Sequence, residues 1–230
     1  MKTGSLVETE FPNIDTKVIE ELSKWEFDNW KYENVNDFLP LIKTMFQNLG
    51  LIEHFKLTES KLESFILKVK EQYRDNPYHN FRHAFDVTQS VYSFLTEMKA
   101  INFLTNLDVL VLLVSALCHD VDHPGFNNKH MIVMDTDIAF KFNDQSVLEN
   151  HHCLTSFTLL KNPLLNFLEN LSKEGFLFFN NLLFLIIIIF YFYFFIFLIF
   201  YLFYFYFIII FFYFLFILLF FYYIFESIKI

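Results

Sequence analysis

Residues 107–128 read LDVLVLLVSALCHDVDHPGFNN, and this stretch decides how the fold is interpreted. Its first part is apolar on every side, which predicts a helix over residues 106–118 that is buried all round. The next five residues, HDVDH at 119–123, place two imidazoles and two carboxylates where that helix ends. A Pro-Gly pair at 124–125 then turns the chain. The sequence therefore brings metal-type ligands to the end of a buried helix.

Helical spacing of apolar residues recurs through residues 1–176, with almost no strand alternation, so the predicted fold class is all-α. Asn36 and Thr58 are the predicted N-caps of two of these helices, and Gly50 is a predicted stop. The DNPYHN stretch interrupts the pattern because a proline disfavours helix at the residue before it. Predicted helices cover residues 14–30, 36–49, 58–75, about 80–99, 106–118, the region around 139, 147–160 and 164–171.

The composition divides the chain into two unlike parts. Residues 1–176 hold 16 of the 17 Lys+Arg and 25 of the 26 Asp+Glu, so the net charge of −9 lies there. This balance argues against nucleic-acid binding through phosphate neutralisation, but not against a small anionic substrate, because a bound cation can reverse the local field. Cys118 and Cys153 form no C-x-x-C pair and are expected to be free and buried. The polar N-terminus shows no signal-peptide pattern, which favours a reducing compartment.

Two short clusters carry the chemistry. His79 and His83 are four residues apart and can share a helix face, although such a pair alone is also typical of ordinary surface histidines. His119, Asp120 and His123 strengthen the case, since imidazole and carboxylate together suit zinc, iron or manganese. The alternative is a surface loop with capping aspartates and one core histidine. Together the clusters predict a metal site between helices of a bundle and favour metal-assisted hydrolysis.

A third polar stretch, NDQSVLENHH at 143–152, could supply groups that orient water at a metal. The candidates are Glu149, His151 and His152. Taken alone, the same pattern would also fit a helix start with an exposed pair of histidines.

The motifs YHNFRHA, CHDVDHPGFNN and FNDQSVLENHH resemble the class I cyclic nucleotide phosphodiesterases in order and spacing. The resemblance runs from about Trp25 to Phe176. The histidine–aspartate core is also similar to the wider HD-domain superfamily of phosphohydrolases, but HPGFNN and LENHH favour the phosphodiesterases. The resemblance implies part of a helical phosphodiesterase-type bundle that acts in signal transduction.

By this resemblance, His79 is the general acid that protonates the leaving 3′ oxygen. His83, His119 and Asp120 are ligands of a tightly bound metal, expected to be zinc. Asp120 also bridges to a second metal, expected to be magnesium or manganese.

The resemblance further implies that His123 and Glu149 hold water at the metals, and that Tyr78 and Asn128 line the nucleotide pocket. The implied reaction is hydrolysis of a 3′,5′-cyclic nucleotide, cAMP, cGMP or both, to the 5′-monophosphate. The family also uses a second metal-binding aspartate, a base-binding glutamine and a stacking aromatic residue further along the domain. Residues 177–230 contain no Asp, Gln or His, so low activity is expected of this chain.

From residue 177 to 225 only Phe, Leu, Ile, Tyr and Asn occur, and 19 of these 49 residues are Phe. We therefore divide the chain into a phosphodiesterase part (1–176), an apolar tract (177–225) and a short tail (226–230). One interpretation of the tract is a membrane anchor, which would place a catalytically inactive metal-binding module at a membrane. The other is translated non-coding sequence, because all five residue types can be encoded by A and T alone. A cytoplasmic location is expected in that case.

Overall fold

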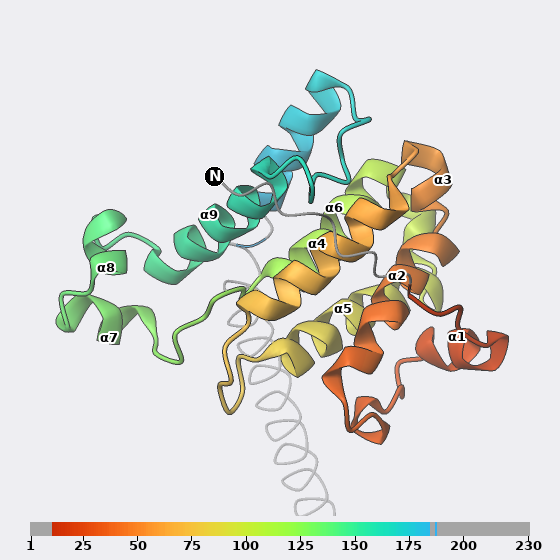
Figure 1. The fold of residues 1–230 in the computed structure, drawn as a ribbon, viewed down its shortest axis with the longest axis horizontal. Coiled ribbons are helices and arrows are strands. Elements are labelled where there is room, and N and C mark those ends of the chain that lie inside the picture. Colours follow the sequence, from red (N-terminus) through yellow and green to blue (C-terminus); the bar gives the residue numbers. More distant parts are fainter. Residues whose placement is uncertain (1–10, 185–186, 188–230) are drawn as a thin grey trace, which may run out of the picture. The chain divides into compact units, whose positions relative to one another are not determined.

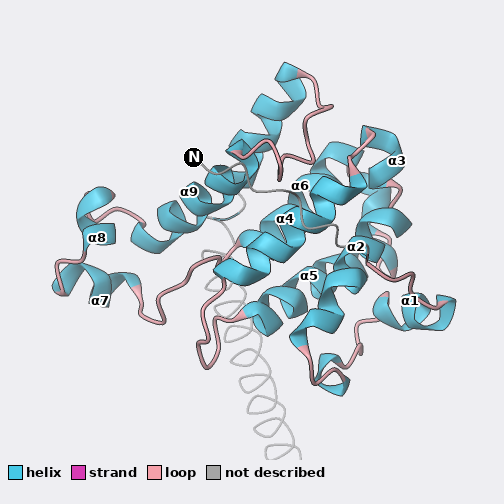
Figure 2. Ribbon diagram, in the orientation of Figure 1, coloured by secondary structure: helices cyan, strands magenta, loops and turns pink. Residues whose placement is uncertain are grey.

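The computed structural model describes residues 11–184 and 187, and within them all regular structure is helical (Figures 1 and 2). The all-α fold class is confirmed. The chain divides into two compact units, with the boundary between residues 188 and 189. The second unit lies outside the described residues. The elements are α1 Thr16–Leu22, η1 Asn29–Lys31, η2 Val35–Asp37, α2 Phe38–Asn48, α3 Leu51–Phe55, α4 Glu59–Gln72, α5 Phe81–Thr96, η3 Ala100–Phe103, α6 Asn106–Cys118, α7 Asn128–Val133, α8 Asp137–Lys141 and α9 Val147–Lys161, where η marks a 3-10 helix.

Helix α6 begins and ends where the sequence predicts. The Thr105 hydroxyl accepts from the backbone N–H of Asp108, and the Asp108 carboxylate accepts from the backbone N–H of Thr105, which is a capping box. Most of its residues are fully buried, because α6 packs against α5 and also contacts α3 and α9. The predicted cap Thr58 precedes α4, and Gly50 takes the left-handed conformation at the end of α2.

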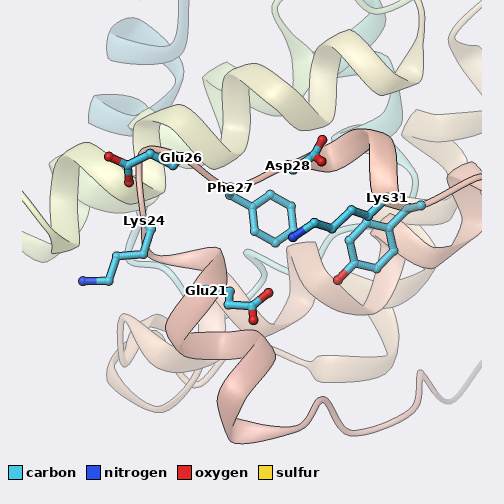
Figure 3. Close-up of a pocket in the computed structure, with 7 residues that line it drawn as sticks. Glu21, Lys24, Glu26, Phe27, Asp28 and Lys31 are labelled. Carbon is cyan, nitrogen blue, oxygen red and sulfur yellow. The ribbon is translucent and has the colours of Figure 1, made fainter.

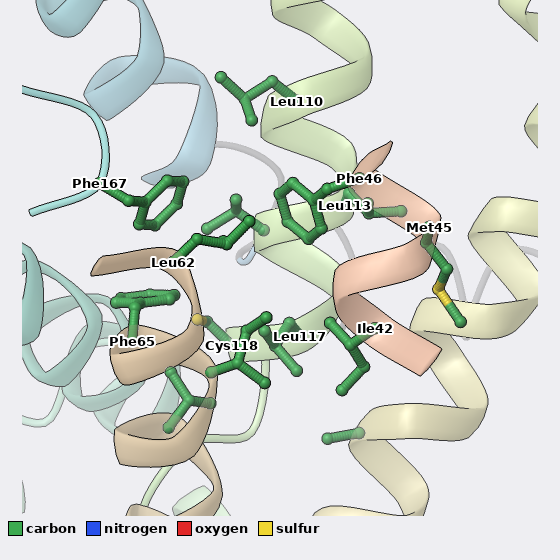
Figure 4. Close-up of a cluster of buried hydrophobic side chains, with 14 of the residues drawn as sticks. Ile42, Met45, Phe46, Leu62, Phe65, Leu110, Leu113, Leu117, Cys118 and Phe167 are labelled. Atoms are coloured by element: carbon green, nitrogen blue, oxygen red, sulfur yellow. The ribbon is translucent and has the colours of Figure 1, made fainter. Parts of the chain in front are cut away.

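The main core is formed by the inner faces of α2, α4, α5 and α6 (Figure 4). Phe46 and Phe65 each contact the ring of Phe167, which lies beyond α9 in the chain. Both cysteines are free and buried, as expected. A separate small cluster joins α7, α8 and the start of α9 and comprises Met131, Ala139, Val147 and Leu148. The end of α6 is therefore held by the main core on one side and by α9 on another.

Three local predictions were wrong. The first helix ends at Leu22 rather than near Trp30, since the Asp28 carboxylate accepts from the backbone N–H of Trp30 and starts a 3-10 turn instead. Asn36 lies inside η2, which is capped by Asn34.

The third concerns residues 164–171, which form turns rather than a helix. The side chains of Asn162 and Asn166 accept from the backbone N–H groups two residues later, and such bonds compete with helix formation.

The beginning of the apolar tract contributes to the core. Residues 173–184 are helical, and Phe179, Leu183 and Ile187 are buried in the main cluster. Their four-residue spacing is helical, but most of the neighbouring residues are also apolar, so the sequence does not show which face is buried. The core thus extends past the predicted boundary at 176. The remainder of the tract, on which the membrane interpretation depends, lies outside the described residues. Within the described part of the chain, no helix is both long and apolar enough to cross a membrane.

Candidate metal centre at the end of helix α6

The candidate residues come from three neighbouring segments. His119 is the C-cap of α6, and Asp120 follows it in a turn. His83 lies in the first turn of α5, where the Asn80 side chain caps the helix by accepting from the backbone N–H of His83. His79 lies just before that cap. Because α5 packs against α6, these groups meet at one end of the helix pair.

The Asp120 carboxylate is at the centre of this cluster. Its Oδ2 atom lies 2.7 Å from His79 Nδ1, 3.3 Å from His119 Nε2 and 3.5 Å from His83 Nε2. The two imidazole atoms His119 Nε2 and His83 Nε2 are 3.2 Å apart. The structure therefore brings ligand atoms of His83, His119 and Asp120 close together. The ligand atoms of His79, His83 and Asp120 also form a group that could hold a metal ion, so the predicted general acid is near enough to act as a ligand.

The donor set fits a cation. His119 Nδ1 donates to the backbone carbonyl of Ala116 (2.8 Å), so Nε2 is the ring nitrogen that faces Asp120 and His83 and that a cation would take after the loss of its proton. Burial raises the pKa of Asp120, but hydrogen bonds from His119, His79 and His83 outweigh it and hold the pKa below its ordinary range. Burial lowers the pKa of His119, and the adjacent Asp120 carboxylate more than reverses this. A carboxylate and converging imidazole lone pairs in a buried site suit a divalent cation.

A second group lies on the other side of the same carboxylate. His152 on α9 is fully buried and has Nε2 3.9 Å from Asp120 Oδ1. Its Nδ1 donates to the backbone carbonyl of Val121 (2.7 Å), and its Nε2 has no hydrogen-bond partner. With Asp120 and His123 it forms a second set that could hold a metal ion. The orphaned Nε2 indicates that a water or a cation belongs there.

His123 is better suited to hold water than to bind a metal directly. Its ring stacks between those of His79 (centroids 3.9 Å apart) and His152 (5.6 Å). Its Nδ1 accepts from the backbone N–H of Gly125 (3.0 Å), so the ring proton lies on Nε2. Burial, together with the nearby His79 ring, lowers the pKa of His123 to about 4. At neutral pH it is therefore a neutral imidazole with an N–H to donate.

The comparisons with known proteins agree with this geometry. The sequence pattern of the family described as "3'5'-cyclic nucleotide phosphodiesterase" matches residues 78–189. A relative from Dictyostelium discoideum, "3',5'-cyclic-nucleotide phosphodiesterase regA", is 48% identical over 163 residues, which are 70% of this chain and 20% of the relative. The human "High affinity cGMP-specific 3',5'-cyclic phosphodiesterase 9A" is 39% identical over 71% of this chain and 27% of its own length.

The chain belongs to the class I cyclic nucleotide phosphodiesterase family. The solved phosphodiesterase domain of Salpingoeca rosetta rhodopsin phosphodiesterase superposes with a TM-score of 0.69 at 36% identity. The match covers 76% of this chain and 53% of that one. The chain thus spans about half of the solved phosphodiesterase domain and less than a third of the curated relatives.

The remaining predicted residues of this phosphodiesterase segment lie around the cluster. The Tyr78 ring is exposed and lies 4.5 Å from the ring of His83. Asn128 Nδ2 donates to both carboxylate oxygens of Glu149 (3.1 and 3.0 Å), and its Oδ1 accepts from the backbone N–H of Leu148. Asn128 therefore fastens α7 to the start of α9. The pocket role of Tyr78 and Asn128 and the water-holding role of Glu149 stay predictions.

Sequence reasoning missed the residues that hold these loops together. Asn76 Nδ2 donates to the backbone carbonyls of His79 (3.1 Å) and His123 (2.7 Å), and so ties the loop before α5 to the turn after α6. The Tyr73 hydroxyl donates to the carbonyl of Leu117 and lies 3.3 Å from the backbone N of Asp120. The only local signal was the break at DNPYHN, which marks a loop but not its partners.

A hollow of about 250 Å³ lies elsewhere, beside α1 and η1 (Figure 3). It contains both signs of charge and none of the clustered histidines, so it is separate from the candidate centre. Its lining consists of Glu21, Lys24, Glu26, Phe27, Asp28, Lys31 and Tyr32.

Proposed function

We propose that this chain carries the metal-binding half of a centre that hydrolyses 3′,5′-cyclic nucleotides to 5′-monophosphates. The observation that carries the proposal is the convergence of His79, His83 and His119 on one buried carboxylate, Asp120. These residues lie within the segment shared with phosphodiesterases. The relatives include enzymes named for cGMP, for cAMP and for both, so the proposed substrate class is the cyclic nucleotide itself.

In this proposal His83, His119 and Asp120 hold a first cation, which we assign as zinc from the imidazole and carboxylate ligands. The second oxygen of Asp120 faces His152 and would share a second cation, magnesium or manganese. Bound divalent cations would polarise the phosphoryl oxygens and lower the pKa of water from 15.7 to about 7.

The chain's own residues then handle protons and orientation. His79 Nδ1 donates to Asp120, which fixes the ring and leaves Nε2 as the atom that can give a proton to the leaving 3′ oxygen. His123 Nε2–H and Glu149 would orient water beside the phosphate, one as donor and one as acceptor. Tyr78 stands exposed next to His83, where the ring of a nucleotide could pack against it.

Turnover by the 230-residue chain is expected to be weak. By family resemblance, a second aspartate and the groups that bind the base belong to the other half of the domain, and residues 177–230 contain no Asp, Gln or His. Positioning of a substrate can supply roughly 7–11 kcal/mol of barrier reduction, which this chain would largely forgo.

The test measures 5′-monophosphate released from cAMP and from cGMP by the purified chain with zinc and magnesium added. The comparison is a longer protein in which residues 177–230 are replaced by the downstream half of a phosphodiesterase domain. We expect the longer protein to be active and its His79→Ala variant to lose roughly 10²–10⁴-fold. Full activity in that variant would contradict the assignment of His79, and inactivity of the longer protein with metals bound would contradict the function.

A second candidate function is a catalytically inactive, membrane-tethered module that binds metal. It is favoured by the absence of any charged residue from 175 to 225. The transcript sequence across codons 170–230 and flotation of the chain with lipid vesicles test it. A spliced transcript that lacks the tract would remove the membrane location and leave a cytoplasmic one.

A further inference from the structure

Asp122 stands between Asp120 and His123 in the turn after α6 and makes two short side-chain contacts. Its Oδ1 atom accepts from Arg74 Nε at 2.7 Å, and its Oδ2 atom lies 2.8 Å from His151 Nε2. Its backbone has φ of 59°, in the left-handed region that Asp and Asn adopt more readily than most residues. Both carboxylate oxygens are thus occupied at a sharp turn.

Arg74, Asp122 and His151 each stand next to a different segment of the candidate centre. The three segments belong to different helices or loops. Arg74 follows Tyr73, whose hydroxyl lies against the Asp120 backbone, and it opens the loop that carries His79. Asp122 separates Asp120 from His123 in the turn after α6. His151 directly precedes His152 on α9.

The contacts therefore join three segments at one carboxylate. Arg74 and Asp122 are 48 residues apart, and His151 and Asp122 are 29 apart. The Asp122 side chain is 26% exposed, that of His151 is 14% exposed and that of Arg74 is 47% exposed. The bond to His151 is therefore partly shielded from water, whereas the bond to Arg74 is exposed. An exposed ion pair contributes little to the free energy of unfolding, about 0–1 kcal/mol. Stability alone is therefore a weak reason for one carboxylate to bind partners from two separate segments. Orientation of metal ligands by outer hydrogen bonds is a common use of such groups.

We infer that Asp122 is a positioning residue, which uses Arg74 and His151 to hold the turn bearing Asp120 and His123 against α9 and the loop of His79. This inference rests on the proposed metal centre. Its direct consequence is that breaking the Asp122 contacts weakens cation binding although none of the three residues is a proposed ligand.

The experiment measures Co²⁺ affinity of the full 230-residue chain by equilibrium dialysis, in a mild detergent that keeps the apolar tract dispersed. Asp122→Asn keeps the size and the left-handed backbone preference of the side chain and removes its charge. We expect it to weaken Co²⁺ binding by about 10–100-fold. The matched control is Glu71→Gln, which breaks the exposed Lys68–Glu71 pair on α4 and should leave affinity unchanged within about twofold.

Two further variants keep the test decisive if Asp122→Asn folds poorly by circular dichroism. Arg74→Met retains the apolar stem and should weaken Co²⁺ binding by about tenfold, while Arg74→Lys should recover much of the loss because it keeps the charge. A purely structural role would lower the melting temperature of the metal-free chain and leave the Co²⁺ affinity of the folded fraction unchanged.

Wild-type Co²⁺ affinity in folded Asp122→Asn and Arg74→Met would overturn the positioning role and leave the metal centre intact. Failure of the wild-type chain to bind Co²⁺ would instead overturn the proposed function, and the positioning role with it.

Discussion

Acidification should destabilise the metal-free protein, and we expect His152 to account for about 2 kcal/mol of the loss between about pH 7.5 and pH 5. This side chain is fully buried between α9 and the turn after α6. Burial lowers the pKa of His152 from its ordinary value of 6.5 to about 3. Its imidazole therefore stays neutral in the folded protein at a pH where an exposed imidazole is charged.

The sign follows from proton uptake. Below its ordinary pKa the imidazole of the unfolded chain binds a proton, whereas the folded chain binds none until the pH approaches 3. The neutral His152 imidazole therefore leaves the free energy of unfolding unchanged well above pH 6.5 and lowers it as the pH falls below that value. At about pH 5 the unfolded state gains RT ln(1 + 10^1.5), which is about 2 kcal/mol.

The assay is urea unfolding in EDTA, followed by circular dichroism at the two pH values. His152→Asn retains an amide that can donate to the Val121 carbonyl, so it removes the titration with little change in the local bond. Its free energy of unfolding should fall about 2 kcal/mol less on acidification than that of the wild type. His130→Asn, on the exposed face of α7, should match the wild type. Equal losses in His152→Asn and the wild type would refute the reasoning.

Three other substitutions test the fold in the same urea assay. Lys43→Met leaves the buried carboxylate of Glu63 without its 2.6 Å partner and should cost about 3–5 kcal/mol, whereas a loss under about 1 kcal/mol would show that the pair is dispensable. Gly125→Ala places a Cβ 2.9 Å from Asn76 Oδ1 at φ of +86° and should cost about 1–3 kcal/mol, and an unchanged urea midpoint would contradict that strain. Leu117→Ala, fully buried near the end of α6, should cost about 2–5 kcal/mol, and a smaller loss would mean that the site collapses around the deletion.

Features that depend on neighbours in sequence were predictable. Both ends of helix α6 were predicted correctly, because its apolar composition leaves no exposed face and a break follows it directly. Helix α4 was placed because Leu62, Phe65, Ile66 and Val69 share one face, and all four are buried. The ligand types of the candidate centre were visible for the same reason, since each of the two motifs lies within five residues.

Features that depend on tertiary contacts were not predictable. Nothing near Arg74 in the sequence indicates that it will meet Asp122, because that contact forms only when the chain after α4 lies against the turn after α6. The contact of Asp122 with His151 forms only when α9 returns to the same turn. Helix α3 was also missed, since five residues are too few to show a helical period. The burial of Phe179 was hidden for a different reason, because nearly all of the surrounding tract is apolar and shows no distinct buried face.

The position of the candidate ligands makes cation binding and turnover separable in this chain. All three proposed first-cation ligands come from α5 and the end of α6, and both elements pack into the described core. Contacts within this half of the domain therefore already place three ligands for a first cation. Turnover also needs a substrate held in line with the activated water, which depends on groups that residues 177–230 do not supply. A chain that binds Co²⁺ but leaves cyclic nucleotides intact is the combination this arrangement favours, whereas turnover without bound metal is the combination it excludes.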